Sequence, residues 1–182
     1  MNDYASISLG PGALLVAHPS MLDPHFHRTV ILLLAHSSEE GAMGVVLNRP
    51  LTVDHIDTDS PIFRWMEDAA DPATIFVGGP VEPNGYICLT TDHTSMSGVR
   101  SIDIESTSTV HIETPHRLFR GYSGWAAQQL ENEIVQHGWY VVRSEPHDAM
   151  TSQPDTLWNE VMSRQVGPLQ RLGQFPTDPR SN

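Results

Sequence analysis

Three short apolar runs between Gly12 and Pro50 constrain the fold of this chain more than any other feature. The runs are Ala13–Ala17, Val30–Ala35 and Val45–Leu47, and two polar, turn-forming inserts separate them. Short apolar runs bounded by turn residues are typical of strands that are buried on both faces of a sheet. We therefore expect the centre of a β-sheet here, with polar side chains at the ends of its strands.

The middle run is predicted to belong to a longer strand, from His25 to His36. Threonine, valine and isoleucine follow one another there, and β-branched residues favour strands over helices. Residues 42–48 are expected to form the next strand. Because only a short polar loop ending at Gly41 separates the two, the pair is predicted to form a hairpin.

The rest of the chain alternates between short strands and amphipathic helices. A tight hairpin turn is predicted at Asn84-Gly85. Further strands are expected at 74–77, 86–91, 99–105, 109–113 and 139–142. Helices are expected after Ser60-Pro61, over Trp125–His137 with Ser123 as N-cap, and after a capping box at 152–155, where Leu157, Trp158, Val161 and Met162 share a face.

These elements predict an α+β fold, with a largely antiparallel sheet and a few packed helices in one domain. The domain is expected to cover residues 12–172. Residues 1–11 are expected to be a flexible lead-in, and residues 173–182 a disordered tail.

The charge of the chain excludes several classes of function. The net charge is −12 with neutral histidines, and all ten basic residues are arginine. Without lysine, the chain has no Walker-type phosphate lysine and no lysine that forms a Schiff base. Because phosphate contacts dominate affinity for nucleic acids, direct DNA binding is disfavoured.

The single cysteine, Cys88, is flanked by isoleucine and leucine and is expected to be a buried, inert thiol. No secretory signal is visible, and the longest aliphatic run is too short to cross a bilayer. These observations predict a cytoplasmic protein without a membrane partner. Nucleotide-binding glycine motifs are absent, so no cofactor is expected.

Polar residues at the predicted strand ends suggest a ligand pocket. Arg28, Asn48 and Arg49 are expected to meet Gly78-Gly79-Pro80, where arginine side chains and backbone amides bind an anion such as carboxylate or phosphate. In the alternative interpretation, the arginines pair with nearby carboxylates and hold the loops. His36 is open to either role.

Two further motifs suggest other chemistry. His25 and His27 would share one face of a strand, about 7 Å apart, which suits a metal ion if Asp23, His93 or His111 supplies a third ligand. Exposed polar positions are the alternative. Around Ser123, the sequence is similar to a nucleophile elbow, but Trp125 replaces the second glycine. Ser123 is therefore expected to cap a helix whose free amides accept an anion.

Several motifs resemble the YqgE/AlgH family of small bacterial proteins. They include Gly12–Pro19, Met21, Asp23-Pro24, Phe26, Arg28–Val30, His36, Gly41–Pro50, Val77–Val81, Gly121–Trp125 and Gln129–Glu131. The resemblance covers most of residues 12–165 and implies an α+β fold with a prominent antiparallel sheet. Family members are often labelled transcriptional regulators, and no enzymatic activity is established for them. This chain departs from the family pattern at Thr90, where histidine is more usual.

Three functions follow from these observations. The first is a non-enzymatic regulatory module that binds a protein partner or a small ligand, for which the arginines indicate an anion. The second is a metal-dependent hydrolase that uses His25 and His27. The third is a transcriptional regulator that contacts DNA directly, which the net charge disfavours.

Overall fold

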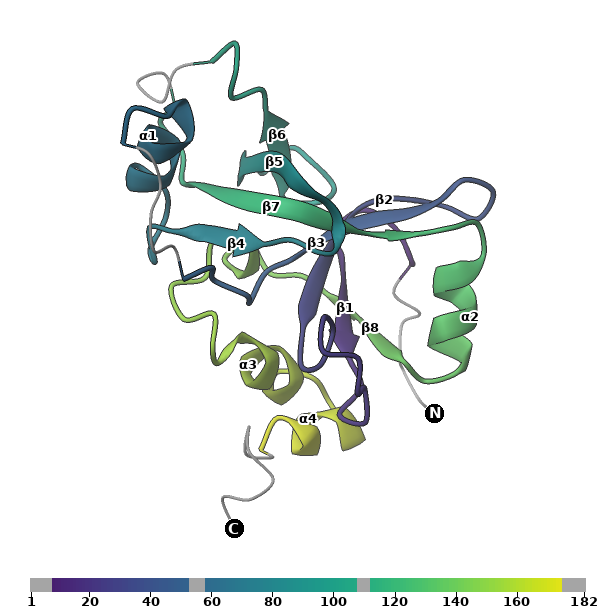
Figure 1. Ribbon diagram of the computed structural model, residues 1–182. Coiled ribbons are helices and arrows are strands. Elements are labelled where there is room, and N and C mark those ends of the chain that lie inside the picture. The colour runs from purple at the N-terminus through teal and green to yellow at the C-terminus, as the bar shows by residue number, and fades with distance from the viewer. Residues whose placement is uncertain (1–7, 53–57, 108–111, 175–182) are drawn as a thin grey trace.

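Eight strands form one curled sheet in the computed structural model, which describes residues 8–52, 58–107 and 112–174 (Figure 1). The strands are β1 (Ala13–Ala17), β2 (Val30–Ser37), β3 (Gly41–Val46), β4 (Ile75–Val77), β5 (Val81–Thr91), β6 (Val99–Ile102), β7 (His116–Trp125) and β8 (Trp139–Arg143). Their order across the sheet is β6-β5-β7-β3-β2-β1-β8, and β4 pairs with β7. Only the β4–β7 pair is parallel among these pairings. The predicted α+β class is confirmed.

The centre of the sheet lies in the segment that the apolar runs indicated. β1 is buried along its whole length, between antiparallel β2 and β8. β2 and β3 form the predicted hairpin, with a bulge between Leu33 and Ala35. The first four residues of β2, Val30–Leu33, are buried on both faces. The strand does not begin at His25, however, because residues 24–28 form a turn that ends at Arg28 with a φ of 53°.

β7 joins the two halves of the sheet, and the sequence did not predict it. Its first part pairs with β5 and with the short strand β4, and its last residues pair with β3. Gly121-Tyr122-Ser123-Gly124 is therefore the end of a strand and not the entrance to a helix. The helix that follows, α2, covers only Gln129–Val135.

The predicted hairpin turn at Asn84-Gly85 is also wrong. β5 continues through both residues, and its pairing with β7 shifts register between Val81 and Tyr86. The two residues lie in a bulge instead, which bends one strand without reversing it. The strand predicted over 86–91 is confirmed as the second half of β5, and β6 is shorter than predicted. The strand expected at 109–113 lies mostly outside the described residues.

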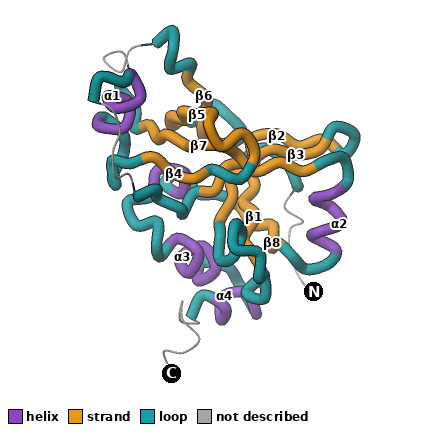
Figure 2. The backbone as a smooth tube through the Cα atoms, viewed as in Figure 1, coloured by secondary structure: helices purple, strands orange, loops and turns teal. Residues whose placement is uncertain are grey.

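Three helices cover three separate parts of the core (Figures 1 and 2). α3 (Leu157–Ser163) packs on one face of the central strands, and α2 packs on the other. α1 (Pro61–Glu67) lies at the far end of β7, where Trp65 packs with Ile75 and Leu118. A 3-10 turn (Asp148–Met150) precedes α3, and a short helix α4 (Pro168–Leu172) follows it.

The predicted start of α1 is correct, whereas the predicted cap of α3 is wrong. Ser60 caps α1 and accepts from the amide of Ile62, with Pro61 in the first turn. The predicted capping box before α3 is absent, since Thr156 is the N-cap and makes no side-chain cap bond. The four apolar residues predicted to share a face of α3 are all buried. No helix among the described residues is long and apolar enough to cross a bilayer.

The ends of the chain are described only in part. Leu9 packs against the core on the α2 side, and the carbonyl of Gly10 accepts from the amide of Ala13. The carbonyl of Gly173 accepts from the side chain of Asn159 on α3. Residues 1–7 and 175–182, where flexibility and disorder were predicted, lie outside the described residues.

Cys88 is buried in β5, as predicted. It is 1% exposed, and burial raises the pKa of its thiol to about 12. The thiolate is therefore scarce at neutral pH, which makes the side chain unreactive.

Arg117 is fully buried inside β7, and it connects two loops to the sheet. Its guanidinium lies 4.3 Å from the ring centroid of Phe76. It donates to four carbonyl oxygens: Ala70 (3.2 Å), Asp71 (2.6 Å), Ala149 (3.4 Å) and Thr151 (2.9 Å). Burial lowers the pKa of Arg117 to about 10, so the side chain stays charged at neutral pH. Its charge is stabilised by carbonyl dipoles and the aromatic face.

We predict that Arg117→Met lowers the free energy of unfolding by about 3 kcal/mol, because it leaves buried carbonyls without donors. Urea unfolding measures the change. Arg100→Met is the control, since Arg100 is an exposed arginine of β6 and its loss is expected to cost less than about 0.5 kcal/mol. Equal effects of the two substitutions would contradict the structural role of Arg117.

Candidate functional site

Asn48 holds the loop before β2 to the residues after β3. The side chain is 6% exposed. Its Oδ1 accepts from the amide of Val30 at 2.9 Å, and its Nδ2 donates to the carbonyl of Arg28 at 2.9 Å. Both partners are backbone groups, so the side-chain amide of Asn48 fixes the start of β2.

The two arginines near Asn48 also have structural contacts. The guanidinium of Arg28 lies 4.5 Å from the ring centroid of Trp158, on α3. Arg49 donates to the carbonyl of His27. Burial lowers the pKa of both arginines. Arg28, Asn48 and Arg49 therefore lie close together, and they hold the loops through an indole ring and backbone groups, where the alternative interpretation expected carboxylates.

Gly78 and Gly79 allow the backbone after β4 to pack closely against the backbone of β7. The carbonyl of Gly78 accepts from the amide of Val46 at 2.9 Å and from Ser123 Oγ at 3.1 Å. A Cβ added at Gly79 would lie 2.2 Å from the backbone carbon of Tyr122. Both glycines thus allow two backbones to pack directly, whereas Pro80 is exposed.

Ser123 is a buried residue of β7. It precedes the start of α2 by six positions, and its hydroxyl donates a hydrogen bond to the carbonyl of Gly78. The predictions of a helix N-cap and of an anion site at that helix start are therefore wrong. The N-cap of α2 is Gln128, which makes no side-chain cap bond.

His25 and His27 lie in the turn that precedes β2. Asp23 Oδ1 accepts from the amide of His25 at 2.8 Å, and the carbonyl of Asp23 accepts from the amide of His27. The ring Nδ1 of His27 is 2.8 Å from the carbonyl of Met21. The strand geometry behind the predicted metal pair is therefore wrong. Among the described residues, no three His, Cys, Asp or Glu side chains are grouped closely enough to hold a metal ion.

His36 lies at the opposite end of β2 from this loop. Its Nε2 is 2.9 Å from Glu131 Oε1, which joins the β2–β3 hairpin to α2. The pKa of the Glu131 carboxyl is lowered, mainly by a hydrogen bond from its own backbone amide and to a smaller extent by hydrogen bonds from His36 and Ser38. His36 therefore does not converge with Arg28 and Asn48, contrary to the predicted pocket.

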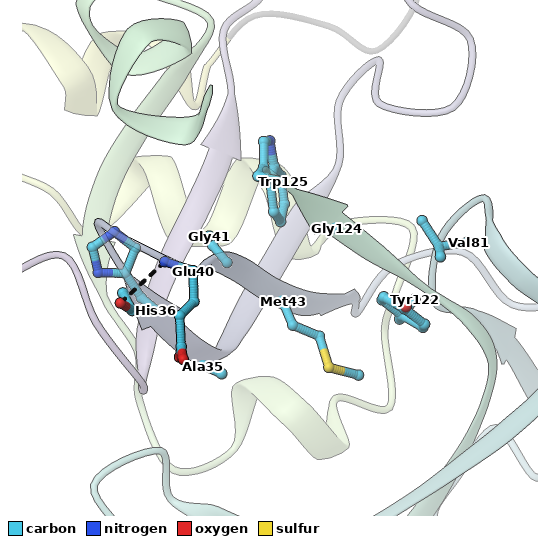
Figure 3. Close-up of a pocket in the computed structure, with 11 residues that line it drawn as sticks. Ala35, His36, Glu40, Gly41, Met43, Val81, Tyr122, Gly124 and Trp125 are labelled. Atoms are coloured by element: carbon cyan, nitrogen blue, oxygen red, sulfur yellow. Dashed lines mark hydrogen bonds between the residues drawn. The ribbon is translucent and has the colours of Figure 1, made fainter. Parts of the chain in front are cut away.

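A depression of about 510 Å³ lies where the hairpin meets the end of β7 (Figure 3). We call it the hairpin pocket. Its lining residues are Ala35, His36, Ser37, Glu40, Gly41, Ala42, Met43, Val81, Tyr122, Gly124 and Trp125.

Strand register decides which side chains face this pocket. Met43 is opposite Ala35 and Gly124, and Val81 is opposite Tyr122. Because neighbours directly across a sheet point to the same face, these five residues form one wall. The adjacent residues His36, Ala42 and Trp125 are paired with one another across the strands, and their side chains point to the other face, towards α2.

Figure 3 agrees with this division. Met43 of β3 and Trp125 of β7 lie on opposite sides of the paired strands, and the carboxylate of Glu40 lies on the same side as Met43. The amide of Glu40 donates to Ser37 Oγ at 3.3 Å, which orders the hairpin loop. The pocket is thus apolar and aromatic, with a carboxylate at the hairpin end.

A family model described as AlgH-like matches residues 14–170. The chain belongs to the AlgH-like family. A UPF0301 protein of Streptomyces coelicolor is 38% identical, with the whole of both chains covered. A UPF0301 protein of Thermobifida fusca is 35% identical, and the match covers 94% of each chain.

Two solved structures have a similar fold. The crystal structure of a Corynebacterium diphtheriae protein is similar to this AlgH-like chain with a TM-score of 0.80 and 27% identity, and the match covers 93% of this chain and 94% of that one. The solution structure of the AlgH protein from Pseudomonas aeruginosa is similar with a TM-score of 0.62 and 26% identity, covering 92% and 94%. The resemblance expected from the sequence motifs is therefore confirmed.

The sequence alone does not predict most of the pocket, although the family motifs include much of its lining. Met43, Tyr122 and Gly124 belong to these motifs without being predicted site residues. Phe119, Tyr122 and Trp125 of β7 are aromatic, and aromatic residues favour strands. This residue type, and not the spacing of three, is the signal in the sequence for β7 and hence for the pocket.

We predict that Asn48→Ala lowers the free energy of unfolding of this AlgH-like chain by about 2 kcal/mol, since it leaves two buried backbone groups without partners. Chemical unfolding measures the change. Asn132→Ala on the exposed side of α2 is the matched control, and it is expected to be neutral or slightly stabilising. If Asn48→Ala left the free energy of unfolding unchanged, the two hydrogen bonds from Asn48 to the loop before β2 would be dispensable for stability.

A second prediction concerns pH. Because the folded-state pKa of Glu131 lies below its usual value of 4.5, its contribution to stability is complete above that pH. The contribution is lost as the pH falls through the lower, folded-state pKa. Glu131→Gln is therefore expected to reduce the unfolding midpoint at pH 7, and the difference from wild type is expected to shrink below about pH 4. A difference that stays constant from pH 7 to pH 3.5 would contradict the ionic role of this carboxylate.

Proposed function

We propose that this AlgH-like chain is a regulatory module that binds a small ligand or a segment of a protein in the hairpin pocket and performs no chemistry on it. One observation carries the proposal. Strands β3, β5 and β7 place Met43, Val81 and Tyr122 on one wall of a depression of about 510 Å³. A depression of this size with apolar walls and few polar groups is typical of small-molecule sites.

The family motifs support the same location. Most lining residues belong to the motifs that the chain has in common with the family, and Ala35, Ser37 and Glu40 do not.

The arrangement of nucleophiles and bases favours binding over catalysis. The imidazole of His36 points to the α2 face and pairs with Glu131. Ser37 Oγ accepts from the amides of Glu39 and Glu40, which keeps it in the hairpin turn. No hydroxyl or thiol among the described lining residues is hydrogen-bonded to a histidine, the arrangement that nucleophilic catalysis uses.

The alternative functions have less support. A hydrolase based on His25 and His27 required two imidazoles on one strand, and they lie in a turn. A DNA-contacting regulator requires a basic surface, and a net charge of −12 opposes the approach of phosphates. Regulation through a ligand or a protein partner needs neither feature.

The lining also bears on the charge of the ligand. The arginines that suggested an anion lie at the far ends of β2 and β3, around Asn48. Glu40 is the charged residue of the hairpin pocket. The pocket thus favours a neutral or cationic ligand over an anionic one.

A substitution that fills the pocket tests the proposal. A Cβ at Gly124 would lie 3.3 Å from the ring of Tyr122 and 3.6 Å from Val81, so a larger side chain fits with a small adjustment. Gly124→Val is expected to weaken at least tenfold the binding of compounds found in a thermal-shift screen of neutral and cationic metabolites and short peptides.

Ala127→Val is the matched control, because Ala127 is exposed just beyond β7 and does not line the pocket. It is expected to leave binding unchanged. If no compound stabilises the wild-type protein, or if Gly124→Val binds the hits as tightly as wild type, the proposed site is wrong.

A further inference from the structure

A second, smaller depression adjoins the hairpin pocket. Its volume is about 160 Å³, and it shares Met43 and Tyr122 with the larger one. The other lining residues come from the bulged part of β5 and from β7: Glu82, Gly85, Tyr86, Ile87 and Gly121. The two depressions therefore lie on either side of one apolar pair of side chains, Met43 and Tyr122.

Each depression has one carboxylate in its lining, Glu40 in the larger and Glu82 in the smaller. Glu40 lies at the hairpin end, on the side of Met43 (Figure 3). At the other end, Glu82 Oε2 lies 3.6 Å from the position that a Cβ on Gly85 would occupy, so its carboxylate lies over the bulge. None of the residues lining either depression is an arginine, and the chain has no lysine.

This combination selects for a particular chemistry. Two separated carboxylates attract two separated cationic groups, and the net charge of −12 adds long-range attraction. Met43 and Tyr122, which line both depressions, can contact the methylene groups of a ligand. The aromatic ring of Tyr122 also attracts a nearby ammonium group through a cation–π interaction. A flexible aliphatic chain with a positive charge at each end satisfies all three features.

Strand geometry sets the length of that chain. The segment of β7 from Tyr122 to Trp125 pairs with Val81 at one end and with Ala42 at the other. It spans about 10 Å at the usual rise per residue. Glu82 and Glu40 come one and two residues beyond these partners, so their Cα atoms are about 20 Å apart along the direction of β7. Because a glutamate side chain reaches about 5 Å from its Cα, the cationic groups need to be about 10 Å or more apart.

We propose that the two depressions together bind a linear polyamine, with one terminal ammonium at Glu40, the other at Glu82 and the methylene chain across Met43 and Tyr122. The inference rests on the proposed function, because it uses the hairpin pocket, and it names the class of ligand.

Isothermal titration at fixed ionic strength tests it, with spermine, spermidine and 1,4-diaminobutane as ligands. Spermine and spermidine are expected to bind, and 1,4-diaminobutane, which is too short to reach both carboxylates, is expected to bind at least tenfold more weakly. Glu40→Gln and Glu82→Gln are each expected to weaken the binding of spermine about fivefold, the upper range for one exposed ion pair.

Glu39→Gln is the matched control. Glu39 is an exposed neighbour of Glu40 outside both linings, so its loss is expected to change the affinity less than twofold. Equal weakening by all three substitutions would show that polyamines respond only to net charge and would overturn the inference. Equal binding of the short and long amines, or the absence of binding, would overturn it as well.

The Gly124→Val variant separates this inference from the proposed function. If spermine does not bind but Gly124→Val abolishes the binding of another compound or of a basic peptide, the pocket is a binding site and only the polyamine assignment is wrong. If Gly124→Val changes the binding of no compound that stabilises wild type, both proposals fail.

Discussion

Burial of the central strands on both faces is the constraint on which the rest of this structure depends. β1 and the first half of β2 are almost completely inaccessible, with α3 on one side and α2 on the other. Each fully buried aliphatic side chain contributes about 1.5–3 kcal/mol, so these strands account for much of the hydrophobic stabilisation. Because burying polar groups in such a layer costs free energy, the polar and charged side chains of these strands lie at the strand ends.

The two ends of the β2–β3 pair differ in what their polar groups do. At one end, the amide of Asn48 is hydrogen-bonded to two backbone groups, and Arg28 and Arg49 contact an indole and a carbonyl. At the other end, the hairpin extends past the core, and Met43 and Glu40 border an open depression. The first end stabilises the fold, and the second, in our proposal, binds a ligand.

The sequence predicted elements whose signals are local. β1, the β2–β3 hairpin and α3 follow from apolar periodicity, and the start of α1 follows from Ser60 and Pro61. β7 escaped prediction because Arg117 and Gly121 interrupt its apolar pattern, although the arginine is buried against carbonyls that other loops supply. The pocket escaped for the same reason, since its wall exists only once β7 places Tyr122 and Gly124 beside Met43.

Hydrogen exchange of the Asn48→Ala variant, followed by mass spectrometry, tests the separate roles of the two strand ends most directly. If Asn48 serves only its own end, the substitution accelerates exchange of the amides in residues 27–31 and 46–50. The amides of the hairpin end, in residues 35–43 and 122–125, then exchange as in wild type. Faster exchange at the hairpin end, by a similar factor, would contradict this division and would show that the loop clamp and the pocket form one cooperative unit.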